Sequence, residues 1–199
     1  MERVIFNNTN LNPNFIGSWN LDPLDLCDEI ISYFESNESK QKKGRTISGL
    51  NQNIKKSVDI NISPNEIKLP KNQVFNSYLN ALFTCHKDYI LQWPFLASFL
   101  NRVEIGTFNI QRYQAGEHFQ QIHSERTSIE SLHRIFAWMT YLNDVDDGGT
   151  TYFSHYGLEI VPRKGLTLIW PAEWTHAHKG NVLHSGSKYI ITGWMDLCT

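Results

Sequence analysis

From residue 103 onward the chain is a succession of short β-rich runs separated by turn residues, and this pattern most constrains its fold. The glycines and prolines that interrupt the runs are Gly148, Gly149, Pro162, Gly165, Pro171 and Gly186. The runs predict strands at residues 103–113, 119–125, 132–143, 150–153, 157–161, 165–170, 174–179 and 187–197. About eight short strands within about 95 residues indicate a small sandwich or jelly roll and exclude a βαβ sheet.

The first half of the chain is organised differently. Residues 1–20 predict irregular chain, because they carry Asn-Pro and Gly-Ser pairs. A helix is predicted from Asp22-Pro23 to about residue 36, and residues 74–86 predict a second amphipathic helix. Residues 57–62 alternate in hydrophobicity and predict a strand, whereas the charge run at 38–45 predicts a solvated loop rather than a binding patch.

These elements predict an α+β fold, a double-stranded β-helix (a cupin-like jelly roll) buttressed by N-terminal helices. We expect residues 1–102 to be a helical and irregular support region packed on the core, and residues 103–199 to be the jelly-roll catalytic core. The two parts are expected to form one structural domain with one hydrophobic core. Apolar residues make up 41% of the 199 residues, which is enough for such a core.

Composition also excludes several classes of partner and location. The formal net charge of −2 argues against a general nucleic-acid binder. No apolar run approaches the length of a membrane span, and the N-terminus does not resemble a secretory signal. We therefore expect a cytoplasmic protein that binds neither nucleic acid nor membrane.

Histidine is concentrated in the β-rich part, where seven of the eight lie between His118 and His184. His123-Ser124-Glu125 lies in one predicted strand and His176-Ala177-His178 in another. Residues i and i+2 of a strand point to the same face, so each pair projects its side chains into one volume. Two imidazoles and one carboxylate on neighbouring strands form the facial triad that holds non-haem Fe(II). Spacing alone is also compatible with a surface pair of side chains.

The residues around these pairs form an ordered series of motifs. In chain order they are Tyr113 to Glu125, Tyr141-Leu-Asn-Asp144, Gly148-Gly149-Thr150, Pro162 to Pro171, Thr175 to Gly180 and Lys188 to Trp194. The series resembles the Fe(II)/2-oxoglutarate-dependent oxygenases of the prolyl 4-hydroxylase-like branch, in particular small single-domain members of marine bacteria and their phages. The resemblance covers about residues 103–197, with a weaker echo at residues 56–59.

The resemblance implies a set of metal ligands. The first two fall on His123 and Glu125, although the wider family more often has Asp at the second position. The distal histidine is open between His176 and His178, which share a face if their strand is regular. In the family a basic residue follows the distal histidine by about nine or ten positions, and Lys188 is ten after His178. We therefore expect His178 to be the third ligand.

The same resemblance implies the cosubstrate site. Lys188 would pair with the distal carboxylate of 2-oxoglutarate, because a buried ammonium needs such a partner. The other residues expected to line this site are Tyr141, Tyr113, Thr192 and Trp194. No catalytic residue is expected beyond the metal and its ligands.

Three further residues are expected at the rim of the pocket. They are His176, Arg126 and His118.

The activity implied is hydroxylation of an unactivated C–H bond, with Fe(II), 2-oxoglutarate and O₂ required and ascorbate expected as a reductant. Proline in a peptide or protein is the first expected substrate, and a free amino acid or small metabolite is the alternative. Two readings from other classes are a cupin-like binding module without turnover and a zinc-dependent hydrolase that uses the same His and Glu. Release of succinate from 2-oxoglutarate separates the oxygenase from the binding module.

Overall fold

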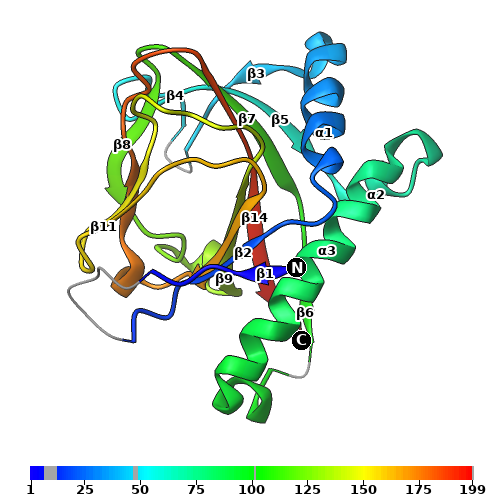
Figure 1. Ribbon diagram of the computed structural model, residues 1–199, viewed down its shortest axis with the longest axis vertical. Coiled ribbons are helices and arrows are strands. Elements are labelled where there is room, and N and C mark those ends of the chain that lie inside the picture. The colour runs from blue at the N-terminus through cyan, green and yellow to red at the C-terminus, as the bar shows by residue number, and fades with distance from the viewer. Residues whose placement is uncertain (7–12, 47–48, 101, 199) are drawn as a thin grey trace.

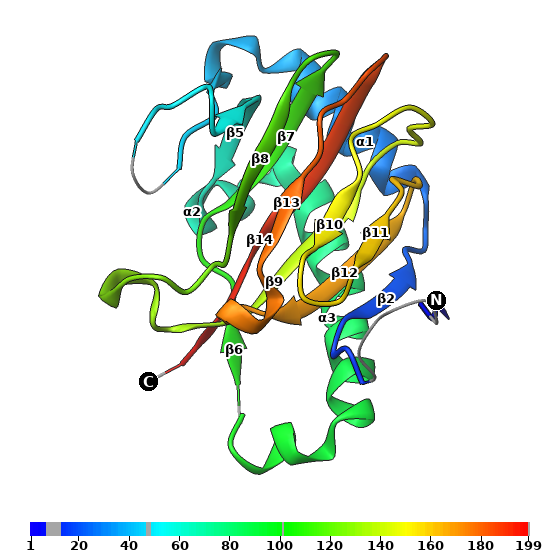
Figure 2. The same ribbon diagram turned by 90° about the vertical axis from the view of Figure 1, so that its left-hand side faces the viewer.

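The computed structural model describes residues 1–6, 13–46, 49–100 and 102–198, and its strands form two antiparallel sheets that face each other (Figure 2). The larger sheet has nine strands, and its central strand β14 (Ser187–Leu197) also pairs with the short β6 (Val103–Glu104). The order of the other strands around β14 is β1 (Glu2–Arg3), β2 (Gly17–Asn20), β12 (Leu166–Pro171), β9 (Arg134–Tyr141), β14, β7 (Phe108–Gln114), β5 (Val58–Ile62) and β3 (Lys42–Lys43).

The smaller sheet has five strands and covers one face of the larger one. Its order is β11 (Leu158–Ile160), β10 (Thr151–Phe153), β13 (His178–Gly180), β8 (His118–His123) and β4 (Lys55–Lys56). Two facing antiparallel sheets confirm the predicted jelly roll.

Helices cover the opposite face of the larger sheet (Figure 1). They are α1 (Asp25–Ser36), the short α2 (Pro64–Ile67) and α3 (Gln73–Gln92). Buried side chains of α3 recur every three or four residues, from Phe75 through Tyr78, Leu82 and Cys85 to Tyr89, so that one apolar stripe faces the sheet. The N-terminal helices therefore buttress the jelly roll as expected.

The apolar side chains form two clusters, one on each face of the larger sheet, rather than one core. Strand β9 shows why, because successive side chains of a strand point to opposite faces. Phe136 and Trp138 pack against the helices, whereas Ala137, Met139 and Tyr141 pack between the two sheets. Both faces of this strand are therefore buried.

Two segments differ from prediction in ways that affect the site. Strand β8 ends at His123, so Glu125 lies in the turn beyond it. Residues 174–179 are not one strand: a 3₁₀ turn, η5 (Trp174–His176), precedes β13. His176 and His178 therefore do not share a strand face.

The N-terminal region holds more regular structure than its sequence predicts. Within residues 1–20, expected to be irregular, lie the strands β1 and β2, while residues 7–12 are outside the described part of the chain. The charged run 38–45 contains a 3₁₀ turn, η1 (Glu38–Lys40), and strand β3. Three other 3₁₀ turns are η2 (Pro70–Asn72), η3 (Pro94–Ser98) and η4 (Ile129–Ser131).

None of the helices in the described ranges is both long and apolar enough to cross a bilayer.

Candidate metal centre and adjoining cavity

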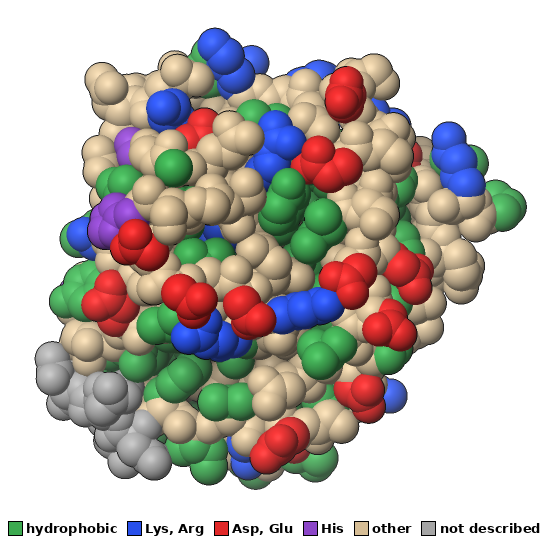
Figure 3. Space-filling model, turned by 45° about the horizontal axis from the view of Figure 1, so that its top comes forward, with side chains coloured by type: hydrophobic (Ala, Val, Ile, Leu, Met, Phe, Trp, Pro, Cys, Tyr) green, Lys and Arg blue, Asp and Glu red, His purple; other side chains and the backbone are tan. Residues whose placement is uncertain are grey.

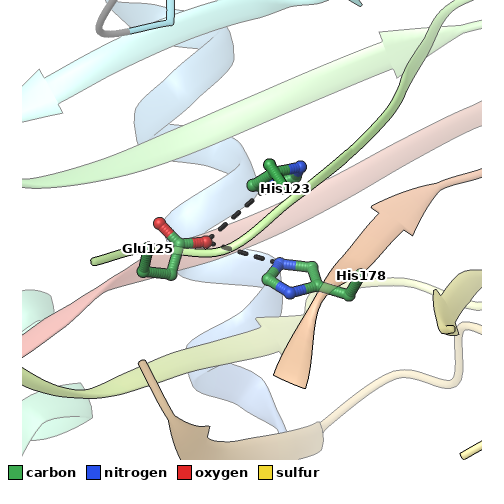
Figure 4. A group of neighbouring side chains, drawn as sticks. All are labelled: His123, Glu125 and His178. Atoms are coloured by element: carbon green, nitrogen blue, oxygen red, sulfur yellow. Dashed lines mark ion pairs between the residues drawn. The ribbon is translucent and has the colours of Figure 1, made fainter. Parts of the chain in front are cut away.

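Two histidines and one carboxylate come together between the two sheets (Figure 4). His123 and His178 are directly opposite each other in the β8–β13 ladder, so their side chains are cross-strand neighbours. Glu125 follows two residues later, and its backbone N–H donates to the carbonyl of Ala172. Oε1 of Glu125 lies 3.6 Å from Nε2 of His123 and 3.4 Å from Nε2 of His178.

The hydrogen bonds of the two imidazoles fix which ring nitrogen carries the proton. Nδ1 of His123 contacts the carbonyl of Gln121 at 2.8 Å, and Nδ1 of His178 contacts the carbonyl of His176 at 2.9 Å. A carbonyl oxygen can only accept, so both Nδ1 atoms are the donors. When Nδ1 carries the ring's only proton, the lone pair of Nε2 points toward Glu125.

The second oxygen of Glu125 is held by a tryptophan. Nε1 of Trp194 donates to Oε2 at 2.8 Å, while Arg134 donates to the backbone carbonyl of Glu125 at 3.0 Å. The guanidinium of Arg134 also lies 3.6 Å from the centre of the Trp194 ring. Burial raises the pKa of Glu125, whereas hydrogen bonds and positive charge from the two imidazoles, which act when Nε2 carries a proton, hold that pKa well below its usual range; a cation between the three groups would act in the same direction. The carboxylate is therefore charged and presents Oε1 to both histidines.

The three donor atoms fit a divalent first-row cation. They lie within 4.8 Å of one another, and donors at right angles about 2.1 Å from one ion would be about 3 Å apart. The two Nε2 lone pairs and the negatively charged carboxylate oxygen repel one another unless a positive charge lies between the three atoms. Imidazole and carboxylate on one side of an ion suit Fe(II), and they leave other coordination positions open.

A buried lysine lies deeper between the sheets. The side chain of Lys188 is 3% exposed, and its Nζ donates to the carbonyl of Gly149 at 2.7 Å. The same Nζ lies 4.5 Å from the ring centre of Tyr113, its cross-strand neighbour. No acidic side chain of the described residues pairs with it, and burial lowers its pKa to about 7. An ammonium in this place is suited to an anionic ligand.

A cavity of about 870 Å³ joins the three donors to Lys188. One face of β14 lines it with Lys188, Ile190, Thr192 and Trp194, which alternate along the strand. Tyr113 also lines it, and its hydroxyl donates to Gln111 at 2.7 Å.

Tyr141 lies behind the cavity wall rather than in it. It is completely buried, and its hydroxyl donates to Oγ1 of Thr151 at 2.6 Å. Thr151 itself lines the cavity. A direct contact between Tyr141 and a carboxylate in the cavity stays a prediction. Thr151, in contrast, lines the cavity, where its hydroxyl can contact such a carboxylate.

None of the three residues expected at the rim is among those that line this cavity. His176 is buried behind the centre, where its Nε2 contacts the carbonyl of Asn14 at 2.9 Å. Arg126 pairs with Glu173 and lines a separate apolar groove. His118 is half-buried on β8.

Sequence reasoning did not identify Arg134, Thr151 or Gln111 as site residues, although all three line the cavity. Gln111 shares a strand face with Tyr113, so alternation along β7 was a usable signal for it. Arg134 and Thr151 stand at strand ends beside ordinary turn residues, and their sequence gives no comparable signal.

The chain is similar to known oxygenases in sequence. Residues 108–196 match the model of the 2OG-Fe(II) oxygenase superfamily. A probable prolyl 4-hydroxylase 9 of Arabidopsis thaliana is 26% identical over 134 residues, which are 54% of this chain and 46% of that protein. The chain thus spans less than half the length of this curated relative. These matches confirm the resemblance expected from the ordered motifs.

Solved structures share the fold. A Pseudomonas putida prolyl-4-hydroxylase superposes with a TM-score of 0.70 at 16% identity, covering 96% of both chains. A prolyl hydroxylase of Trichoplax adhaerens, in complex with a hypoxia inducible factor oxygen degradation domain peptide fragment, gives a TM-score of 0.70 at 15% identity. That alignment covers 94% of this chain and 86% of the other.

Proposed function

Starting from the match of residues 108–196 to the 2OG-Fe(II) oxygenase superfamily, we propose that the chain is an Fe(II)- and 2-oxoglutarate-dependent dioxygenase. It hydroxylates an unactivated C–H bond, with proline in a peptide or protein as the expected target. One observation carries the proposal most directly. Two Nε2 lone pairs and one carboxylate oxygen converge in a cavity that also contains a buried ammonium without an acidic partner.

His123, Glu125 and His178 would hold Fe(II) from one side. When bound, the iron and 2-oxoglutarate together supply the oxidation, in which O₂ and 2-oxoglutarate give succinate, CO₂ and the hydroxylated product. The two backbone carbonyls that hold the imidazoles keep both Nε2 atoms aimed at the ion. Ascorbate belongs to this proposal as the reductant that keeps the iron ferrous.

Lys188 would bind the carboxylate of 2-oxoglutarate that is remote from the metal. The ring of Tyr113 supports the ammonium from one side, and the hydroxyl of Thr151 can donate to the same carboxylate. Around His178 the rings of Phe153 and Trp170 pack at 5.4 Å and 5.1 Å and keep water away from the ligand. The chain's own part is thus orientation, charge pairing and exclusion of water.

A peptidyl substrate is supported by the relatives. The curated relative is named as a prolyl 4-hydroxylase, and the Trichoplax adhaerens structure contains a peptide. A free amino acid or small metabolite is the alternative within the same class. A binding module without turnover is the alternative of another class; it does not need three metal donors and a buried lysine in one cavity, and both are present here.

The test is succinate formation from 2-oxoglutarate under Fe(II), O₂ and ascorbate, measured with and without proline-containing peptides. Succinate that rises with peptide, together with a 16 Da mass gain on proline, supports the proposal. A mass gain only on free amino acids would replace the substrate and keep the class. No succinate from iron-loaded protein under any condition would overturn the class in favour of a binding module.

A further inference from the structure

The side chains that line the cavity carry an excess of positive charge. Three are acidic: Asp59, Glu66 and Glu125. Seven are basic: Lys40, Lys42, Lys43, Arg45, Lys55, Arg134 and Lys188. The whole chain has a net charge of −2, so this excess belongs to the cavity and not to the surface in general. On the face seen in Figure 3, acidic and basic side chains are interspersed.

Ion pairs and the proposed cofactors do not remove the excess. Lys55 pairs with Asp59 at 2.6 Å, and Lys40 pairs with Glu66 at 2.8 Å. The two charges of Fe(II) and those of 2-oxoglutarate cancel, and Glu125 offsets one more positive charge. The remaining positive charge lies mainly on Lys42, Lys43 and Arg45, which form no ion pair with any described residue.

These three side chains, here called the basic edge, stand on a fixed backbone. Lys42 and Lys43 form β3 and pair with Asp59 and Val58 of β5, so Lys42 shares the cavity face with Asp59, whereas Lys43 lies on the opposite face. The N–H of Gly44 donates to the carbonyl of Ser57 at 2.9 Å, and a Cβ on Gly44 would collide with the Ser57 hydroxyl. The close packing of this backbone positions the basic edge where the cavity meets solvent.

The basic edge is exposed, whereas His178 and Lys188 are buried, so a ligand that contacts both must extend from the interior to the surface. An extended peptide can reach from the interior to the surface, because each of its residues adds about 3.3 Å of length. Resting on the proposed function, we propose that the substrate is an acidic peptide. Its carboxylates, near the residue to be hydroxylated, bind Lys42 and Arg45 while the target side chain faces the metal.

The test compares proline peptides of one sequence that carry Glu, Gln or Lys on both sides of the proline. Binding is measured by fluorescence anisotropy with Mn²⁺ in place of iron, and turnover by succinate release. We expect the Glu peptide to bind about tenfold more tightly than the Gln peptide at low salt, and the advantage to shrink as salt is raised. The K42E/R45E variant should lose this preference and favour the Lys peptide.

The matched control is K68E/K71E, which makes the same change of charge at exposed positions outside the cavity and should keep the preference for Glu. Equal binding of the three peptides to the wild type, or the same loss of preference in both variants, would overturn the proposal. A free acidic amino acid that competes as well as the Glu peptide would also overturn it, because a small acid needs no extended contact. Failure of succinate formation would instead contradict the proposed function, since the anisotropy measurement does not depend on turnover.

Discussion

The indole N–H of Trp194 donates to Oε2 of Glu125 at 2.8 Å, which leaves Oε1 to face the two histidines. Glutamate has one more methylene than the aspartate expected at this position, and so has more rotamers to restrict. Trp194, stacked on Arg134, restricts them from outside the donor set. A residue expected to contact the cosubstrate thus also fixes the orientation of the proposed metal ligand.

The role of Trp194 can be measured through metal affinity. Trp194→Phe keeps the ring but removes the donor to Oε2, so we expect affinity for Mn²⁺ or Co²⁺ to fall by about 1.5–3 kcal/mol, the worth of a hydrogen bond to a charged group. Isothermal titration of the metal measures it. Trp174→Phe, at a side chain 69% exposed, is the control and should leave metal affinity unchanged. Equal affinities of wild type and Trp194→Phe would exclude the orienting role.

Two variants test whether His178 or His176 is the third metal ligand. His178→Ala should abolish binding of the metal, because a two-ligand site holds Fe(II) poorly. His176→Gln should retain the metal while losing about 1–3 kcal/mol of stability, since Nε2 of His176 contacts a backbone carbonyl away from the centre. Metal content and urea unfolding measure the two effects. Loss of the metal from His176→Gln with normal stability would reverse the assignment.

Two variants of Glu125 test whether its carboxylate is a metal ligand. Glu125→Asp should keep part of the metal binding, because the charge remains although the shorter side chain cannot reach both Trp194 and the ion. Glu125→Gln should lose most of it, because the amide lacks the negative charge that holds a hard cation. Iron content and succinate formation are the measurements. Normal turnover in Glu125→Gln would mean that the carboxylate ligand lies elsewhere.

The lowered pKa of Lys188 predicts that binding of 2-oxoglutarate depends on pH. Burial lowers its pKa to about 7, so the empty site loses this charge as the pH rises through 7. A bound carboxylate favours the ammonium, so binding takes up a proton above pH 7. The Kd for 2-oxoglutarate should therefore rise by up to about tenfold per pH unit above 7 and be nearly flat below it.

Variants of Lys188 provide the control for that profile. Lys188→Arg should remove the pH dependence, because guanidinium stays charged throughout this range. Lys188→Ala should weaken 2-oxoglutarate binding by about 2–5 kcal/mol at pH 6.5, where the wild-type lysine is charged. Titration calorimetry across pH measures both variants. A profile for Lys188→Ala that matches the wild type would remove Lys188 from the cosubstrate site.

The buttressing helices can be tested through stability. Phe75 of α3 is fully buried, with its ring centre 5.7 Å from that of Phe108 on the sheet. Phe75→Ala should lower the free energy of unfolding by about 3–5 kcal/mol. The exposed Phe95 is the control, and Phe95→Ala should change it by less than about 0.5 kcal/mol. Urea unfolding of both variants measures the difference, and equal effects would mean that α3 does not support the sheet.

The long periodic elements could be predicted from the sequence because their signals are local. The alternation of β14 and the helical spacing of α3 are repeated over many residues, and both elements were found. The two-residue strands β1, β3 and β4 have no period to read, because each exists only through its partner strand. Their positions depend on contacts between segments far apart in the chain.

The site was predictable to a similar degree. The spacing to Lys188 favoured His178 over His176, although the argument of a shared strand face does not apply because η5 ends at His176. The hydrogen bond of Trp194 to Glu125 depends on Glu125 lying beyond the end of β8, which a predicted strand through residue 125 hides. The charged run 38–45 was expected to be solvated loop, and only the tertiary fold brings it to the cavity.

The outermost strands of the two sheets have a consequence for behaviour at high concentration. Three of the four, β1, β3 and β4, are two residues long and consist only of charged residues. An open strand edge offers unpaired N–H and C=O groups to another molecule, but a short charged edge gives a second sheet neither length nor apolar surface to pair with. Lys42, which faces the cavity from β3, therefore also belongs to an edge that protects the protein from edge-to-edge aggregation.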